Sequence, residues 1–515
     1  MLKMVDGTGI IGVDMVCPLG VSTPQPPNYD NMEMEGVGSL MLPNSLKAPL
    51  ERLELIGNST QGENPAPDNP QEIKNAGRKS KNLLNLQKQP DVKEAYLGWK
   101  VSDGRNVVLS VKDKGNNADI TGCYLGLSRT GGSSDGVVWA VNNGSVAAKE
   151  VVSKNQYVSV FPSNETTVRK LLERFDIQVE YGNNATDYEP YGYLIDLKIT
   201  GENLLSNKPT DWMIGKTTSW GAVPQTPVSY GKNVKNAIAT INVKSSTNYS
   251  FINKETNKLW VCRIIELDAN GLGLVNHALY ANESFNYKKY NFSTRSNTAN
   301  IVFEIKKVDN TELLSTDIES NKIMLVEGEV NEPTPYEPYT EQFAKIALDE
   351  PLRGIGEYKD TITKDGVVRK IKRVVLDGSE DEKWGLSREH TNHINFALVL
   401  KDATTVNTGI RTMMDKFKHF GAVWNSDVAG QDMFGKTLRI NIQKTLASTA
   451  EEFKTWLSQN PLIVDYVLAE PVTEPLPESV QAQLQALHCE NGTTHVFVDS
   501  GEVPCGIKLT YRKEK

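Results

Sequence analysis

Tyr188-Glu189-Pro190-Tyr191 returns later in the chain as Tyr336-Glu337-Pro338-Tyr339, and this repeated closing motif decides the predicted fold. Each copy ends a segment that opens, more than a hundred residues upstream, on an Asn-Leu-Leu opening motif. The two opening motifs are Asn82-Leu83-Leu84 and Asn203-Leu204-Leu205. Similar motifs around two segments of similar length predict a repeated module. Repeated β-modules in one long chain are more typical of scaffolds and binding arms than of a single active site.

The composition is that of a large globular protein. A chain of 515 residues is too long for one hydrophobic core, so about three to five domains are expected. Hydrophobic residues at 39% and charged residues at 23% lie near the globular norm and argue against disorder. The net charge of −8 argues against a nucleic-acid groove, which needs clustered Lys and Arg. No run of about eighteen apolar residues is present, so we expect no membrane span.

The start of the chain and its cysteines favour synthesis in the cytoplasm. Residues 1–19 lack the charged start and apolar run of a secretory signal. The five cysteines are scattered singly, without a CxxC pair, which is typical of reduced thiols.

The first 80 residues are expected to attach the protein and connect it to the modules. Residues 1–50 are rich in Gly, Pro and Met and contain Pro24-Gln25-Pro26-Pro27, which cannot donate to a sheet. We interpret them as an extended N-terminal attachment arm, with a floppy terminus as the alternative. Residues 51–80 combine a short strand at Glu51-Arg52-Leu53-Glu54-Leu55 with a stiff, proline-rich connector.

Residues 81–195 and 196–342 are each predicted to form a jelly-roll-like β-sandwich. Valine-rich and alternating runs are bounded there by Gly, Asp and Asn, as in residues 106–111 and 237–243. One helical segment, from Glu165 to Phe175, precedes the last strand of the first module. Many short strands separated by turns favour a sandwich or jelly roll.

The rest of the chain is divided into a connector and a third unit. Residues 343–386 are predicted to form a β-hairpin connector, because Asp365-Gly366 lies between two β-prone runs. Residues 387–515 are predicted to form a C-terminal β or α+β domain with one helix, capped at Ser448 or Thr449. The predicted fold class is therefore mainly β, with tandem jelly-roll or sandwich modules.

The closing motif is expected to end the last strand of each module. Its proline stops the ladder, and its two tyrosines offer large rings that cover the sandwich edge. We interpret Tyr188, Tyr191, Tyr336 and Tyr339 as module-closing residues that fix the angle of the next domain. Stacking of these rings on a sugar is the alternative.

Tryptophan rings are the best candidates for ligand binding, because the CH groups of a sugar can stack on the face of an aromatic ring. Trp212 and Trp220 lie in a polar stretch rich in Gly and Thr, and Trp99 lies in the first module. We predict these three as glycan-binding residues, with packing in the core as the alternative. For Trp139 and Trp260, which lie inside apolar runs, core packing is favoured.

The sequence predicts no catalytic residue, no cofactor and no metal site. His390 and His393 have only Glu389 nearby, and zinc needs three or four ligands. Acidic residues cluster in Ser379-Glu380-Asp381-Glu382, but a solvated turn explains them better than a pair of carboxylates across a cleft. Neither a GxSxG elbow nor a phosphate-binding GxxxxGK[ST] loop is present.

Several segments in one order resemble minor tail and baseplate-associated structural proteins of siphophages and prophages of Gram-positive bacteria. The resemblance covers roughly residues 50–515. It rests on residues 57–73, on the modules that end in Tyr-Glu-Pro-Tyr, and on residues 347–384. It continues in Phe453-Lys454-Thr455-Trp456-Leu457 and Leu468-Ala469-Glu470-Pro471.

This resemblance implies a virion protein of a tail, baseplate or fibre with carbohydrate-binding-type jelly rolls. The implied partners are other virion proteins, further copies of the chain (a trimer being favoured) and a host-surface polysaccharide, without nucleic acid. Two alternatives stay open. One is a glycan-degrading tail enzyme with accessory sandwiches, and the other is a head or neck fibre that acts as a spacer.

Overall fold

The computed structural model describes residues 29–85, 97–130, 136–161, 165–218, 221–224, 234–254, 260–279, 289–307, 309, 311–331, 335–421 and 423–515. Strands account for 49% of the described residues and helices for 9%, which confirms the predicted mainly β class. The strands form several antiparallel sheets, and hydrophobic side chains gather in separate clusters between them.

The first module is a two-layer sandwich. One layer has the strand order β11-β10-β9-β13-β7 and the other has β12-β8-β14. Buried side chains such as Leu109, Leu125 and Val158 fill the space between the layers. Its elements are β7 (Leu97–Lys100), β8 (Val107–Asp113), β9 (Tyr124–Ser128), β10 (Val138–Asn142), β11 (Ser145–Val146), β12 (Glu150–Ser153), β13 (Tyr157–Phe161), α1 (Glu165–Arg174) and β14 (Phe175–Tyr181).

The second module repeats this plan. One layer has the order β17-β16-β18-β23-β20-β21 and the other has β22-β19-β24. Its elements are η1 (Pro209–Asp211), β16 (Met213–Thr218), β17 (Gly221–Pro224), β18 (Asn236–Asn242), β19 (Asn248–Asn253), β20 (Trp260–Leu267), β21 (Gly273–Leu279), β22 (Lys289–Ser293), β23 (Asn300–Lys307), α2 (Ser315–Glu319) and β24 (Ile323–Glu327). The order β18-β23-β20-β21 matches β7-β13-β9-β10, and in both modules a helix precedes the last strand.

A buried asparagine joins the opening motif of the first module to its closing motif. The Asn82 side-chain oxygen accepts a hydrogen bond from the backbone N–H of Val179 at 3.1 Å. Its amide donates to the backbone carbonyl of Glu189 at 3.2 Å. Val179 lies in the last strand and Glu189 in the closing motif, so one side chain holds the two ends of the module together.

Asn203 does the same in the second module. It accepts from the backbone N–H of Leu325, in the last strand, at 3.2 Å, and donates to the carbonyl of Glu337 at 3.2 Å. The side chain is fully buried. The two motifs that repeat in the sequence therefore meet in space in each module, through the same pair of hydrogen bonds.

A twelve-stranded central sheet connects the modules. Its main path is β25-β15-β36-β2-β37-β3-β28-β29-β35-β32, with β1 paired to β37 and β6 paired to β15. The strands are β1 (Tyr29–Val37), β2 (Ser39–Ser45), β3 (Arg52–Ile56), β6 (Arg78–Lys79), β15 (Tyr193–Thr200), β25 (Glu341–Leu348), β28 (Thr361–Ile362), β29 (Gly366–Leu376), β32 (Thr412–Met414), β35 (Leu462–Pro475), β36 (Gly492–Asp499) and β37 (Gly506–Glu514). Alternate residues of β15, such as Leu197, enter a core that Leu509 and Leu484 share.

Two predicted boundaries need correction at this sheet. Residues 29–45, predicted as part of an extended arm, form β1 and β2, because β37 and β36 from the far end of the chain pair with them. Residues 1–28 lie outside the described residues. Residues 343–386, predicted as a connector, supply β25, β28 and most of the long pairing with β35, so they belong to the central sheet. The same region holds the short strands β4 (Ser59–Thr60), β5 (Lys74–Asn75), β26 (Gly354–Ile355) and β27 (Tyr358–Lys359).

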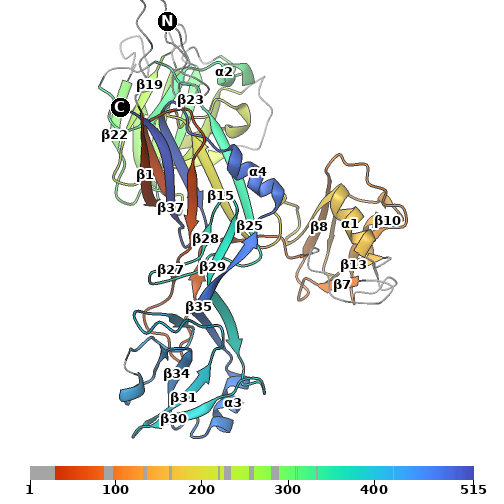
Figure 1. The fold of residues 1–515 in the computed structure, drawn as a ribbon. Coiled ribbons are helices and arrows are strands. Elements are labelled where there is room, and N and C mark those ends of the chain that lie inside the picture. The colour runs from red at the N-terminus through yellow and green to blue at the C-terminus, as the bar shows by residue number, and fades with distance from the viewer. Residues whose placement is uncertain are drawn as a thin grey trace, which may run out of the picture.

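The predicted third unit is also divided. Its first part has its own core and forms the end of the molecule farthest from the C-terminus in Figure 1. This distal unit contains β30 (Gly385–Glu389), β31 (His393–Val399), η2 (Val423–Asn425), β33 (Gly430–Phe434), β34 (Thr437–Gln443) and α3 (Ala450–Gln459). The helix capped by Thr449 was predicted, but a second one, α4 (Glu478–Ala486), was not. After α4 the chain returns to the central sheet, so residues 387–515 are not one domain.

The first module lies to one side of the central sheet in Figure 1, and the second lies against it. The distal unit is joined to the sheet through the long β29–β35 pair. Asp465, fully buried on β35, accepts two hydrogen bonds from the Arg373 guanidinium, both at 2.7 Å. A bidentate pair of this kind holds its two strands in one geometry.

Candidate functional site

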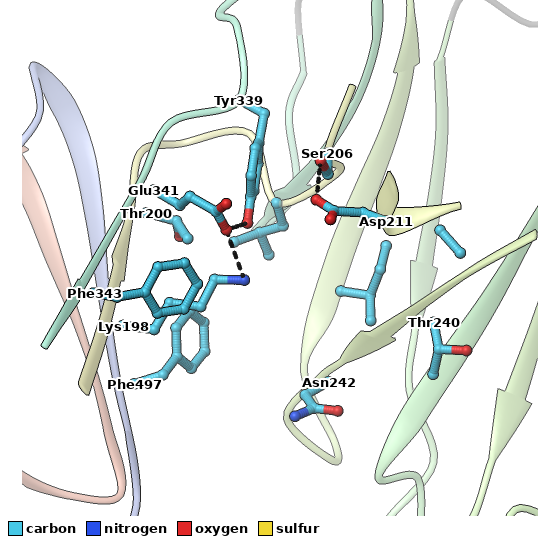
Figure 2. Close-up of a pocket in the computed structure, with 13 residues that line it drawn as sticks. Lys198, Thr200, Ser206, Asp211, Thr240, Asn242, Tyr339, Glu341, Phe343 and Phe497 are labelled. Atoms are coloured by element: carbon cyan, nitrogen blue, oxygen red, sulfur yellow. Dashed lines mark hydrogen bonds and ion pairs between the residues drawn. The ribbon is translucent and has the colours of Figure 1, made fainter. Parts of the chain in front are cut away.

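A pocket lined by aromatic and polar side chains lies between the central sheet and the second module. It encloses about 500 Å³. Figure 2 shows side chains from both bodies around the same space. Its lining consists of Lys198, Thr200, Leu204, Ser206, Asp211, Ala239, Thr240, Ile241, Asn242, Tyr339, Glu341, Phe343 and Phe497.

Strand register builds the floor of this pocket. On neighbouring strands β25, β15 and β36, Phe343 is opposite Lys198, which is opposite Phe497. The face of β15 that carries Lys198 is the one turned away from the core of the sheet, because successive side chains on a strand alternate. The floor is therefore a row of two aromatic rings with a lysine between them (Figure 2).

A second row of the floor lies two residues along the same strands. There Thr200 is opposite Glu341 on one side and His495 on the other. The Thr200 side chain is 1% exposed, and its hydroxyl has no hydrogen-bond partner among the described residues. A buried hydroxyl without a partner costs free energy, so this position favours a ligand group or a water that pairs with it.

The walls come from the second module and from the closing motif. Strand β18 contributes Ala239 to Asn242 on one side. The segment before η1 contributes Ser206, whose hydroxyl donates to Asp211 at 2.5 Å. Tyr339 closes the pocket near the central sheet.

Glu341 is the electrostatic centre of the pocket. Its carboxylate accepts a hydrogen bond from the Tyr339 hydroxyl at 2.6 Å and pairs with Lys208 and, at 3.6 Å, with Lys198. Burial alone raises the pKa of Glu341, but the hydrogen bonds from Lys208 and Tyr339 outweigh it and hold the pKa below its usual value. Burial and the neighbouring carboxylate raise the pKa of Tyr339, so its hydroxyl stays protonated.

A larger cavity of about 780 Å³ lies where the first module meets the central sheet and α4. Tyr188 and Tyr191 of the first closing motif line it, together with Lys345 and Gln483. The carboxylate of Glu189, between these tyrosines, pairs with Arg78 at 2.9 Å. Both closing motifs thus lie where a module meets the central sheet, but only the cavity at the second has a buried, unpartnered hydroxyl among the described residues.

The structure corrects the prediction for Trp212. This side chain is 4% exposed and packs in the core of the second module, edge-on to Phe303 with ring centroids 6.2 Å apart. Its indole N–H donates to the Ser206 carbonyl at 2.7 Å. The polar sequence around Trp212 reflects the turn that carries it, while the ring itself points inward, so it offers no stacking face.

The other two tryptophans predicted to bind a glycan are Trp99 and Trp220. Trp99 lies on β7 and is half-buried against the core of the first module, away from both pockets. Trp220 lies outside the described residues.

The four tyrosines lie at or near the module ends. Tyr339 is buried and Tyr191 is exposed by 42%. Burial raises the pKa of Tyr188. Tyr336 packs against a small cluster beside β24, which contains Met324.

Sequence reasoning missed Lys198, Glu341, Phe343 and Phe497. The alternation of β15 was visible as Leu194-Ile195-Asp196-Leu197-Lys198-Ile199, which marks Lys198 as facing away from the core. The sequence contained no signal that β15 pairs with β25 and β36. This pairing brings Glu341, Phe343 and Phe497 close to Lys198.

Two properties of the described residues bear on other chemistries. No helix among them is long and apolar enough to cross a membrane. In the same part of the chain, no group of three or more His, Cys, Asp or Glu side chains is placed to hold a metal ion. His393, considered above as a ligand, has its Nδ1 at 2.9 Å from Asp427.

Comparison with known proteins leaves the family open. No protein-family model matches the chain, and no curated protein is similar to it. The infectious bursal disease virus VP2 subviral particle is 8% identical, with a TM-score of 0.11 over 95% of this chain and 82% of that chain. The Gx strain of the same virus is 8% identical, with a TM-score of 0.12 over 95% and 83%. Likeness at this level carries no argument about fold or function.

Proposed function

We propose that the protein is a structural component of a phage tail, baseplate or fibre that works by contact and binds a glycan of the host surface. Assembly contacts hold it in the particle, and the pocket beside the second module receives the glycan. The observation that carries this proposal is the pocket itself, a concave site with aromatic rings and polar groups at the junction of two separate cores. Ligand sites are found preferentially at such junctions.

The construction of the chain supports a mechanical role. Several β cores follow one another, and buried polar side chains hold the ends of the modules and the strands that lead to the distal unit. Asn82 and Asn203 close the modules, and the Arg373–Asp465 pair holds the distal unit. A stiff body of this kind keeps a binding surface at a fixed distance and angle from its attachment point.

The resemblance of residues 50–515 to tail-associated proteins supports the same place in a particle. Homo-oligomers with closed symmetry are the common arrangement for such assemblies, and we expect a trimer. Light scattering on the purified full chain, at the concentration used for assembly, measures this directly. A mass of a single chain at every concentration would contradict the expected trimer.

The place in the virion is tested by purifying the particles released from cells that carry the gene. Mass spectrometry of the particles is expected to detect this chain, and gold-labelled antibody is expected to mark the tail or its tip. Absence of the chain from particles that retain their other structural proteins would overturn the proposal. Label on the head or neck would favour the spacer alternative.

A further inference from the structure

We propose that the pocket between the second module and the central sheet binds a neutral pyranose sugar. Phe343 is the stacking surface, and Thr200 and Lys198 are hydrogen-bonding partners. This inference rests on the proposed function, since it names the class of ligand that the site takes.

The stacking surface is an aromatic ring left uncovered on the pocket floor. Phe343 is 57% exposed and lies on β25, the strand at one end of the central sheet, next to Lys198 and near Phe497. The Lys198 ammonium lies 5.6 Å from the centre of the Phe343 ring and leaves much of the side chain exposed. The CH groups of a pyranose match the negative face of such a ring, and covering the ring removes apolar surface from water.

Polar groups surround this ring on several sides. The Thr200 hydroxyl is buried and has no partner in the described part of the chain, so a sugar hydroxyl that reaches it gains a hydrogen bond that the free protein lacks. The Lys198 ammonium is 3.6 Å from Glu341, beyond a normal hydrogen bond, so its donors are available to a ligand. Asn242 lies across the pocket from them (Figure 2).

The charges of the lining select a neutral ligand. Among the lining residues, Lys198 carries one positive charge, and Glu341 and Asp211 carry two negative charges. Lys208, which is not part of the lining, pairs with Glu341 and brings the formal charge of this group to zero. The carboxylate of Glu341 lies between the two ammonium groups and leaves neither of them unpaired. A phosphate or a uronate would meet these carboxylates without a spare cation, whereas sugar hydroxyls can both donate to carboxylates and accept from ammonium groups.

The size of the pocket agrees with this class. Its volume of about 500 Å³ lies within the range of roughly 300 to 1,000 Å³ that small-molecule sites occupy. A short saccharide fits such a space, and it would be held on one side by the sheet and on the other by β18.

Saturation-transfer NMR on the full chain tests the assignment. The probes are the methyl glycosides of glucose, galactose and N-acetylglucosamine, with glucuronic acid and glucose 1-phosphate as charged counterparts. We expect transfer to at least one neutral glycoside and weaker or no transfer to the charged sugars. Phe343→Ala is expected to lower the affinity for that glycoside about tenfold.

Two further variants separate binding from folding. Thr200→Val removes only the unpartnered hydroxyl, so we expect an unchanged or higher melting temperature together with an affinity lowered about fivefold. Phe434→Ala is the matched control, because Phe434 is 59% exposed but lies in the distal unit. It is expected to bind the glycoside as the unsubstituted chain does.

Several results would overturn the assignment. They are transfer to none of the neutral glycosides, transfer to the charged sugars alone, or equal affinity in the unsubstituted chain and the Phe343 and Thr200 variants. If the chain is present in purified particles but one of these results is found, the place in the virion stands and only the sugar assignment fails. Pocket-dependent binding by a chain that particles lack would keep the sugar site and remove the place in the virion.

Discussion

Replacing Asn203 by alanine should selectively destabilise the second module. The fully buried side chain satisfies three backbone groups: the N–H of Leu205 at 3.0 Å, the N–H of Leu325 at 3.2 Å and the carbonyl of Glu337 at 3.2 Å. Alanine leaves the two buried N–H groups without this partner, whereas Glu337 is exposed and its carbonyl can pair with water. At about 2 kcal/mol for each buried group, the loss in free energy of unfolding is about 4 kcal/mol.

Differential scanning calorimetry measures this loss, because the separate cores can unfold in separate transitions and a single two-state fit does not apply. For a module of this size, about 4 kcal/mol corresponds to a melting transition lowered by about 10 °C. Asn82→Ala is the companion variant and should lower the transition of the first module instead. Asn270→Ala, at an exposed turn of the second module, is the control and should leave both transitions in place. If the melting temperature of the second module in Asn203→Ala lies within a degree or two of that in the control, the Asn203 hydrogen bonds do not stabilise the module as proposed.

Three further changes test other parts of the structure. Burial beside Lys244 lowers the pKa of His495 to about 4. The His495 imidazole therefore binds a proton near pH 6.5 in the unfolded chain but only near pH 4 in the folded chain. The free energy of unfolding should fall by about 3 kcal/mol as the pH drops through this window, although the Glu327 carboxylate lies 3.6 Å from the imidazole. His495→Gln should remove this part of the pH dependence in acid unfolding curves, and identical curves would contradict it. Asp465→Ala leaves the charge of Arg373 without its partner, so the free energy of unfolding should fall by about 3 to 5 kcal/mol in thermal unfolding experiments. An unchanged free energy would argue against a stabilising role of this pair between β29 and β35. Trp212→Ala should cost about 3 to 5 kcal/mol in the second module, and a surface-like loss below about 0.5 kcal/mol would return this ring to the list of ligand candidates.

The module plan could be predicted from the sequence because its signals are local or repeated. The opening and closing motifs recur in the same order, and the structure shows why: Asn82 and Asn203 each bond the closing motif of their own module. The helix that begins after Thr449 was also predictable, since its cap and its apolar face lie within one short segment.

The central sheet could not be predicted because its strands come from both ends of the chain. Nothing near Tyr29–Val37 indicates that residues 506–514 pair with it along its whole length. Most side chains of this edge strand are exposed, so it also lacks the alternation that marks a half-buried strand. The prediction placed the distal unit and the last strands in one domain for the same reason. The long-range pairing of β35 with β29, which carries the chain from the distal unit into the central sheet, has no local signal in the sequence.

The pocket depends on the same long-range pairing. Lys198, Phe343 and Phe497 are neighbours only because three strands from distant parts of the chain lie side by side. A polar sequence neighbourhood favoured Trp212 as a surface ring, but tertiary packing against Phe303 decided its position. Local composition therefore does not decide whether an aromatic ring faces solvent or the core.

We propose that this protein holds a glycan by contact and does not cleave it. The most direct test incubates the purified full chain with polysaccharide from the host cell surface, and follows polysaccharide bound to the protein and free reducing ends over time. We predict that polysaccharide is retained, that Phe343→Ala reduces the retained amount, and that the reducing ends stay constant. Reducing ends that increase with time and in proportion to the protein would contradict the account.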